Sequence, residues 1–159
     1  MTVISNTSPL LNLALIDQLP LVESQFEHVV VPRAVWEELM AGHDGVERLE
    51  AFRDRGGVRV VEPDPTDLRT ELDRELDRGE ATALAYAVNI DADRILLDER
   101  EARAAATRHD IQVTGVIGIL LRASEHESID LRSEFDALRE AGFWIADGLY
   151  EKALEADRE

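Results

Sequence analysis

The sequence predicts a three-layer α/β/α sandwich around a central, mostly parallel sheet. Short apolar runs of strand length alternate along the chain with stretches of helical periodicity. Strands that are separated by helices pair in parallel through right-handed crossovers, which place helices on both faces of the sheet. The 159 residues are the size of one domain and can bury about two-thirds of the surface of the unfolded chain. We therefore expect a single domain over residues 1–159.

Five apolar runs, rich in Val, Ile and Leu, are the candidate strands. They are Val3–Ser5, Val29–Val31, Val58–Val61, Ile95–Leu97 and Ile111–Val113. Gly56 and Gly57 interrupt a helix before the third run, and Pro63 and Pro65 end that run.

The helices between these runs have recognisable starts and ends. Ser8 is the expected cap of the first helix, with Pro9 at its first position, and Pro32 opens a helix that ends near Gly42. Further helices are expected over residues 66–77, 80–89, 99–109, 116–125, 131–141 and 147–156.

The composition excludes several classes of protein. There is no cysteine, so a disulfide framework and a thiolate metal site are both impossible. No stretch has the length of a membrane span and the N-terminus does not read as a signal peptide, so we expect a cytoplasmic protein. The four histidines lack zinc-site spacing, and the absence of a glycine-rich loop argues against a nucleotide-binding doubly wound domain.

The charge is strongly acidic. Asp and Glu number 34 against 17 basic residues, a formal net charge of -17 that argues against a protein coating nucleic acid by general attraction. One interpretation is a halophilic protein, because at about 1 M salt the Debye length falls to roughly 3 Å and surface repulsion is screened. The other is an ordinary acidic protein, and composition does not decide between them.

Two strand candidates end on polar side chains that suit a metal ion. Asn6 follows the first run and Asp98 follows the fourth. In an open parallel sheet, ligands bind beyond the carboxyl ends of the strands. Each residue also has a structural interpretation, because Asn6 can cap a turn and Asp98 can cap the helix that begins at Glu99.

Two glutamates are further candidates. Glu80 follows Gly79 at a helix start, where the helix dipole favours a carboxylate whatever its role. Glu37 and Glu38 are about equally far from the apolar face of their helix, so helical geometry does not choose between them.

Six blocks of sequence, in this order and spacing, resemble the PIN-domain family. They are VISNTSPLLNLA, VVVPRAVWEELMAG, LDRGEATALAYA, ILLDEREARAAA, VTGVIGILLRA and LREAGFWI. The resemblance covers nearly the whole chain and is greatest to a prokaryotic subgroup related to the VapC-type toxins of toxin-antitoxin modules.

The resemblance implies a metal-dependent ribonuclease that uses Mg²⁺ or Mn²⁺. The acidic positions of the family fall on Asn6, Glu38, Glu80 and Asp98, with Glu99 as an additional member. Glu38 is chosen over Glu37 on this basis alone. Hard divalent cations take oxygen ligands, which this set supplies.

One departure from the family concerns the first of these positions, where Asn6 replaces the usual aspartate. The site then has three carboxylates in place of four, and its metal affinity should be lower. A catalytically silent module that binds a protein partner or RNA is therefore the alternative to an enzyme.

The remaining expectations concern substrate and partners. Residues expected to contact RNA or support the site are Thr7, Ser8, Arg100, Arg103 and Thr114, although Glu99 and Arg103 have the spacing of an ordinary surface ion pair. The resemblance also implies an antitoxin protein and a homodimer. The segment 143–145, Phe-Trp-Ile, either contributes apolar surface to that dimer or closes the core.

Overall fold

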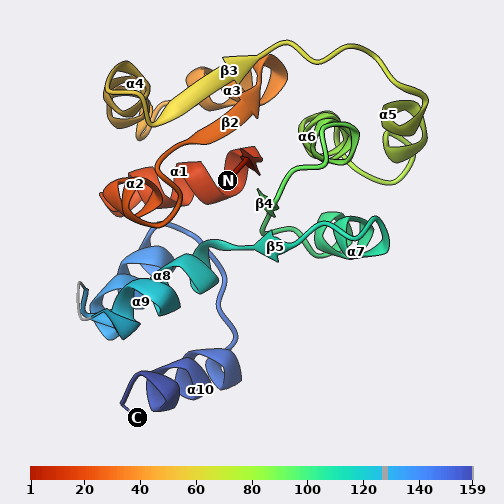
Figure 1. The fold of residues 1–159 in the computed structure, drawn as a ribbon. Coiled ribbons are helices and arrows are strands. Elements are labelled where there is room, and N and C mark those ends of the chain that lie inside the picture. The colour runs from red at the N-terminus through yellow and green to blue at the C-terminus, as the bar shows by residue number, and fades with distance from the viewer. Residues whose placement is uncertain (127–128, 159) are drawn as a thin grey trace.

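A five-stranded, all-parallel sheet with helices on both faces organises the molecule. The structure is a computed structural model that describes residues 1–126 and 129–158. The strand order is β3-β2-β1-β4-β5 (Figure 1). The strands are β1 (Val3–Ser5), β2 (Val29–Pro32), β3 (Val58–Val61), β4 (Arg94–Leu96) and β5 (Val113–Thr114). The predicted three-layer fold is thereby confirmed.

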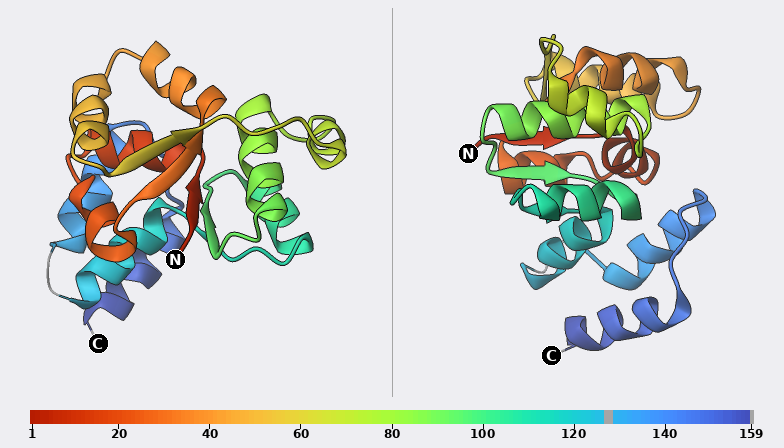
Figure 2. Two further views of the ribbon diagram at one scale, coloured as in Figure 1. Left: turned by 45° about the horizontal axis from the view of Figure 1, so that its top comes forward. Right: turned by 90° about the vertical axis from the view of Figure 1, so that its right-hand side faces the viewer.

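Helices connect the strands and cover the sheet. They are α1 (Thr7–Leu15), α2 (Pro20–Phe26), α3 (Arg33–Ala41), α4 (Val46–Asp54), α5 (Asp67–Leu72), α6 (Arg78–Asn89), α7 (Arg100–Arg108), α8 (Val116–Glu125), α9 (Leu131–Glu140) and α10 (Asp147–Arg158). Helices α1, α2, α4 and α8 lie on one side of the sheet, and α5, α6 and α7 on the other (Figures 1 and 2). Helices α9 and α10 pack with α8 beyond the β5 end of the sheet.

The core explains why the central strands are continuous apolar runs. A parallel sheet covered on both faces has no solvent side, so its strands do not alternate in polarity. Ile4 and Ile95, paired in register on β1 and β4, are both fully buried. Leu13 of α1 and Phe52 of α4 are fully buried as well. The ends of β1 and β4 are therefore held by a packed core.

Several element boundaries differ from the sequence prediction. Helix α1 begins at Thr7 with Asn6 as its N-cap, rather than at Pro9 with Ser8 as its cap. Helix α5 ends at Leu72 rather than at residue 77, because Asp77 caps the next helix. Helix α2 was not predicted.

The last strand is displaced along the chain from the predicted run, Ile111–Val113. Asp110 has a left-handed φ of 60°, which turns the chain after α7. The backbone N–H of Ile111 donates to the carbonyl of Ala106 in that turn, so pairing with β4 begins only at Gln112, whose carbonyl accepts from the N–H of Ile95.

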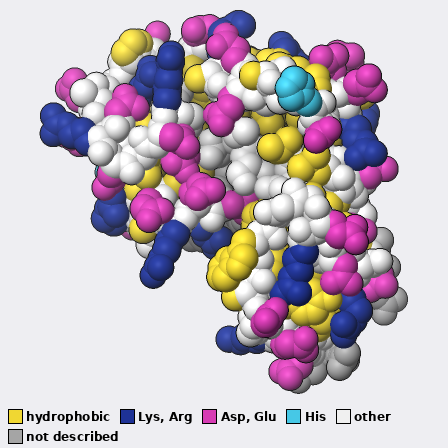
Figure 3. Space-filling view, turned by 180° about the vertical axis from the view of Figure 1, so that it is seen from behind, with side chains coloured by type: hydrophobic (Ala, Val, Ile, Leu, Met, Phe, Trp, Pro, Cys, Tyr) yellow, Lys and Arg dark blue, Asp and Glu magenta, His cyan; other side chains and the backbone are white. Residues whose placement is uncertain are grey.

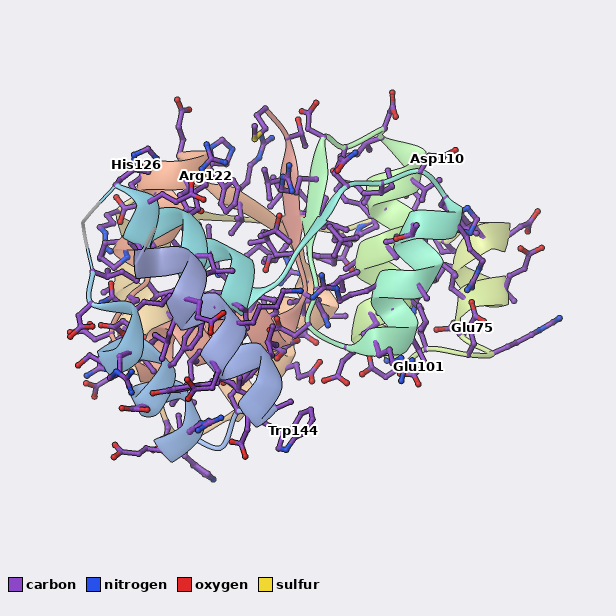
Figure 4. All side chains as sticks on the ribbon, turned by 90° about the horizontal axis from the view of Figure 1, so that it is seen from below. Glu75, Glu101, Asp110, Arg122, His126 and Trp144 are labelled. Carbon is purple, nitrogen blue, oxygen red and sulfur yellow. The ribbon has the colours of Figure 1, made fainter. Side chains whose placement is uncertain are left out.

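The aromatic segment near the C-terminus divides between core and surface. Ile145 is buried and Phe143 is half-buried, whereas Trp144 is 81% exposed and points away from the body (Figure 4). The segment therefore closes part of the core and leaves one large aromatic side chain outside it. The homodimer stays a prediction.

No helix in the described part of the chain is both long and apolar enough to cross a membrane. The face opposite that of Figure 1 carries many Asp and Glu side chains interspersed with fewer Arg and Lys (Figure 3). Exposed ion pairs such as Arg33–Glu62 contribute little stability individually, so they offset little of the repulsion expected from a charge of -17.

We expect the melting temperature to rise as potassium chloride approaches molar concentrations, because screening relieves the repulsion among surface carboxylates. Thermal denaturation followed by circular dichroism measures the effect. Sorbitol of matched osmolality serves as the uncharged control. A melting temperature that stays flat or falls with salt would contradict the halophilic interpretation and leave the fold unaffected.

Candidate active site

The candidate site lies at the carboxyl edge of the sheet, where β1 and β4 are neighbours. From β1 the strand order runs to β2 and β3 on one side and to β4 and β5 on the other, so this is the switch point where open α/β sheets bind ligands. Asn6 directly follows β1, and its N–H donates to the carbonyl of Leu96 at the end of β4 (3.1 Å). Asp98 lies two residues further along from Leu96.

The side chain of Asn6 is free of the capping role that its position allows. Asn6 is the N-cap residue of α1 with an extended backbone, but its side chain makes no capping hydrogen bond. The residue is only 5% exposed. The amide is thus held inside the crevice, with its oxygen available to a ligand.

Gly79 marks where three side-chain oxygens converge. A Cβ atom at this position would lie 3.0 Å from Glu38 Oε2, 3.4 Å from Asn6 Oδ1 and 3.6 Å from Asp77 Oδ1. Glu38 reaches this point from α3, and its Oε2 accepts a hydrogen bond from Thr7 Oγ1 (3.1 Å). A side chain larger than hydrogen at position 79 would fill the space between these oxygens.

The structure separates the two glutamates that helical geometry left equivalent. Glu38 faces Asn6 and Gly79, whereas Glu37 lines a different cavity with Arg33 and Glu62. Glu38 is therefore the one of the two that lies beside Asn6, and its role as a metal ligand stays a prediction.

Glu80 uses one carboxylate oxygen to begin α6 and leaves the other unused. Its Oε1 accepts from the N–H of Asp77 (3.2 Å), and Asp77 Oδ1 accepts from the N–H of Glu80 (2.8 Å), which forms a capping box. Among the described residues, Glu80 Oε2 is buried with no hydrogen-bond partner. Burying an unsatisfied carboxylate oxygen is costly, and a cation would remove that cost.

Burial also changes the acidity of Glu80. Desolvation raises the pKa of this carboxyl from 4.5 to about 7, the hydrogen bond from the Asp77 backbone opposes the rise, and the charges of Asp77 and Glu99 add to it. The carboxyl therefore titrates near neutral pH while no cation is bound.

Asp98 is fixed by two hydrogen bonds from other parts of the fold. Its Oδ1 accepts from the N–H of Val116 at the start of α8 (2.8 Å), and its Oδ2 accepts from Ser8 Oγ (3.2 Å). The pKa of Asp98 is raised above its ordinary value because burial outweighs the lowering effects of these two hydrogen bonds and of the nearby charge of Arg103. The N-cap residue of α7 is Glu99, so Asp98 does not cap the helix that follows it.

The hydroxyl residues after β1 hold the carboxylates in place. Thr7 donates to Glu38 and Ser8 donates to Asp98, which links α1 to both. Thr114 is on β5, where it accepts a hydrogen bond from the guanidinium of Arg94.

The arginines of α7 differ in their surroundings. Arg100 and Arg103 are both exposed. A Cβ atom on Gly115 would lie 3.1 Å from Arg103 Nη1 and 2.6 Å from Asp98 Oδ1, so Arg103 and Asp98 both lie beside this glycine. Among the described ion pairs, none joins Arg103 to Glu99, whereas Arg108 pairs with Glu75. Arg103 is thus adjacent to the site, and the surface ion pair expected from its spacing does not form.

Within residues 1–126 and 129–158, no cluster of three His, Cys, Asp or Glu side chains forms a ready-made metal site. The oxygens around Gly79 instead combine the carboxylates of Glu38 and Asp77 with the amide oxygen of Asn6. Every donor is an oxygen atom, the preference of Mg²⁺ and Mn²⁺, and water commonly completes such sites. The unpartnered Glu80 Oε2 and the three side-chain oxygens gathered around Gly79 both suit a cation.

Asp77 is the residue that sequence reasoning missed. It was placed at the end of a helix, but its carboxylate caps α6 and contributes to the pKa of Glu80. The signal was available in the sequence, since an N-cap residue followed by Glu three positions later, as in Asp77 and Glu80, is the pattern of a capping box.

An open parallel sheet with oxygen donors gathered at its switch point defines an α/β protein with a candidate ligand site at that edge. A family model described as DUF3368, PIN domain, matches residues 2–159. The chain therefore belongs to the PIN-domain family, as its sequence blocks predicted, and has the fold of a nuclease. No curated protein matches the chain, and no solved structure does.

We expect Glu80→Gln to stabilise the metal-free protein at pH 8 but not at pH 4. Because folding raises the pKa from 4.5 to about 7, the stability contributed by the protonated carboxyl is fully present below pH 4.5 and is lost as pH rises through about 7. Glutamine cannot ionise and retains an oxygen for the capping box, so the gain at pH 8 should be about 1–3 kcal/mol.

Urea denaturation in the presence of a chelator measures this difference at the two pH values. Glu101→Gln, at an exposed position in the first turn of α7, is the matched control. Equal effects of Glu80→Gln at pH 4 and pH 8 would show that burial does not perturb Glu80.

Proposed function

We propose that the protein is a metal-dependent ribonuclease, in which Asn6, Glu38, Glu80 and Asp98 bind Mg²⁺ or Mn²⁺ and Glu99 adds negative charge beside them. The observation that carries the proposal is the buried, unpartnered Glu80 Oε2 at the carboxyl edge of the sheet, in a chain of the PIN-domain family. A bound divalent cation supplies Lewis-acid stabilisation of the phosphodiester oxygens during hydrolysis.

The residues of the chain prepare this chemistry by orientation. Ser8 and the N–H of Val116 fix the carboxylate of Asp98, and Thr7 fixes that of Glu38. Preorganised ligands avoid reorganisation when substrate and cation arrive. A cation at Glu80 Oε2 competes with the proton there, so occupancy should increase as the pH rises through about 7.

The positive charge beside the site suits an RNA strand. The guanidinium of Arg103 is close to Asp98 and has no ion-pair partner among the described residues, which leaves it available to a phosphate. We assign Arg100, which precedes it on the same exposed helix start, a weaker role in steering RNA.

The role in the cell that we propose is that of a toxin in a toxin-antitoxin module, acting in the cytoplasm. The proposal rests on the resemblance of the ordered sequence blocks to VapC-type proteins and includes an antitoxin as partner and a homodimer. A small neighbouring gene for a DNA-binding protein with a disordered tail would support it.

A second candidate function follows from Asn6. An amide oxygen in place of a carboxylate weakens cation binding, and Glu80 already serves as a helix cap. A silent module of the same fold that binds RNA or a protein partner is the function that these two features favour.

Cleavage of single-stranded RNA by the purified protein separates the two functions. We expect cleavage with Mn²⁺ or Mg²⁺ and none after chelation by EDTA. Restoring an excess of Mn²⁺ after EDTA controls for loss of the protein. Cleavage that persists in EDTA would contradict a metal-dependent enzyme, and absence of cleavage with intact RNA binding would favour the silent module.

A further inference from the structure

An open cavity of about 520 Å³ lies beside the candidate active site, along the outer edge of β5. Its wall includes residues of β5, α2, α7, α8 and α10. Gly115 belongs to this wall, and a Cβ on Gly115 would be 2.6 Å from Asp98 Oδ1. The cavity is therefore separated from the carboxylate of Asp98 by a single residue without a side chain.

The charge of this cavity is opposite to that of the protein. Arg94, Arg103 and Arg122 line it, and none of its described lining residues is an Asp or Glu. The chain as a whole has twice as many acidic as basic residues. An acid-free cavity with three arginines is therefore a local reversal of charge, which attracts an anion.

Among the described ion pairs, the arginines of the cavity lack the carboxylate partners that some of the arginines elsewhere in the structure have. Six others pair with nearby carboxylates, namely Arg33, Arg48, Arg55, Arg69, Arg108 and Arg139. In the cavity, Arg94 donates to Thr114, while no described ion pair involves Arg103 or Arg122. Their guanidinium groups are free to form bidentate hydrogen bonds with phosphate oxygens.

The rest of the wall suits the other parts of a nucleotide. Phe26, Ile117 and Leu121 supply apolar surface, and Gln25 and Thr114 supply polar groups. Arg122 follows Gly115 by seven residues, about 10 Å along α8. Figure 4 shows Arg122 toward the His126 end of this helix, away from the site. The guanidinium of Arg103 thus lies next to the candidate site, and that of Arg122 lies further along the same cavity.

We propose that this cavity binds the RNA backbone next to the cleaved phosphodiester, with Arg103 and Arg122 contacting different phosphates of the same strand. The proposal rests on the proposed function for the nature of the strand. It adds Arg94, Arg122 and the β5 edge to the residues that bind substrate, and it defines the direction in which the strand leaves the metal ligands.

Binding in the presence of EDTA tests this proposal independently of cleavage. The probe is a short, fluorescein-labelled single-stranded oligo(A) RNA, followed by fluorescence anisotropy at a salt concentration where circular dichroism shows an intact fold. We expect Arg103→Gln and Arg122→Gln each to weaken binding about tenfold and to reduce the salt dependence of log K by about 0.7.

Arg59→Gln is the matched control, because Arg59 is exposed on β3 at the opposite edge of the sheet. It should bind RNA as the wild type does. Equal affinities for the wild type, Arg103→Gln and Arg122→Gln would overturn the proposal. Displacement of the RNA by equimolar adenosine monophosphate would also overturn it, since the cavity would then be a site for a free nucleotide.

The cleavage assay distinguishes failure of this proposal from failure of the proposed function. If the Mn²⁺-loaded protein cuts RNA, Arg122→Gln should raise KM and leave kcat unchanged, and an unchanged KM would count against the cavity. If the wild type does not cut RNA but binding depends on Arg103 and Arg122, the cavity proposal is supported and only the nuclease function fails.

Discussion

Asp98→Asn is expected to reduce RNA cleavage by about a hundredfold or more while leaving the protein folded. The carboxylate of Asp98 is half-buried and held by Ser8 and by the N–H of Val116, so it offers a fixed negative charge at the site. Asparagine keeps an oxygen that can accept from Val116, which preserves the start of α8. The charge that attracts the cation is lost.

Cleavage rates with Mn²⁺ and circular dichroism spectra of both proteins measure these two effects. Asp110→Asn removes one negative charge at an exposed position in the turn after α7 and serves as the control. If Asp98→Asn and the wild type cut RNA equally, the activity must come from a contaminating nuclease or from a different site.

Asn6→Asp is expected to bind Mn²⁺ at least about tenfold more tightly than the wild type. The side chain of Asn6 points its oxygen toward Gly79, where the oxygens of Glu38 and Asp77 also lie. A fourth carboxylate adds a charged ligand for the cation. Without a cation, the same charge is repelled by its neighbours, so this variant should melt at a lower temperature in EDTA and recover in Mn²⁺.

Isothermal titration calorimetry with Mn²⁺ checks the affinity, and Asn89→Asp, at the exposed end of α6, controls for the change in net charge. Aspartate is as good an N-cap residue as asparagine, so α1 should be unaffected. Unchanged Mn²⁺ affinity in a folded Asn6→Asp protein would favour the silent module. Tighter binding without RNA cleavage would indicate a metal-binding module that has lost its catalytic role.

The fold was largely predictable because its central strands are buried on both faces. Runs such as Val29–Val31 and Ile95–Leu97 have no polar alternation, which distinguishes them from the amphipathic helices between them. The short α2 was missed because its buried residues, including Leu21 and Phe26, do not form a long periodic pattern. The position of β5 depends on a left-handed turn at Asp110, which local sequence does not determine.

The site was predictable in part because two of its residues directly follow strands of the sheet. Asn6 and Asp98 follow strands, and strand ends meet at one edge of a parallel sheet whatever the details of packing. The choice between Glu37 and Glu38 depends on how α3 packs against α6, which helical angle alone does not specify. The hydrogen bond from Val116 to Asp98 spans eighteen residues and two elements, and no local pattern indicates it.

Glu80 divides its two oxygens between the protein and a ligand. Oε1 completes the start of α6, whereas Oε2 has no hydrogen-bond partner among the described residues, so the helix start needs no ion. In domains such as zinc fingers, the ion is itself part of the folding reaction, and its removal unfolds the chain. Here the start of α6 is complete without an ion, so ion binding would add stability to a chain that already folds. Under the proposed function, the apoprotein would therefore be a folded, inactive reservoir, and the fraction of active molecules would follow the free concentration of the cation.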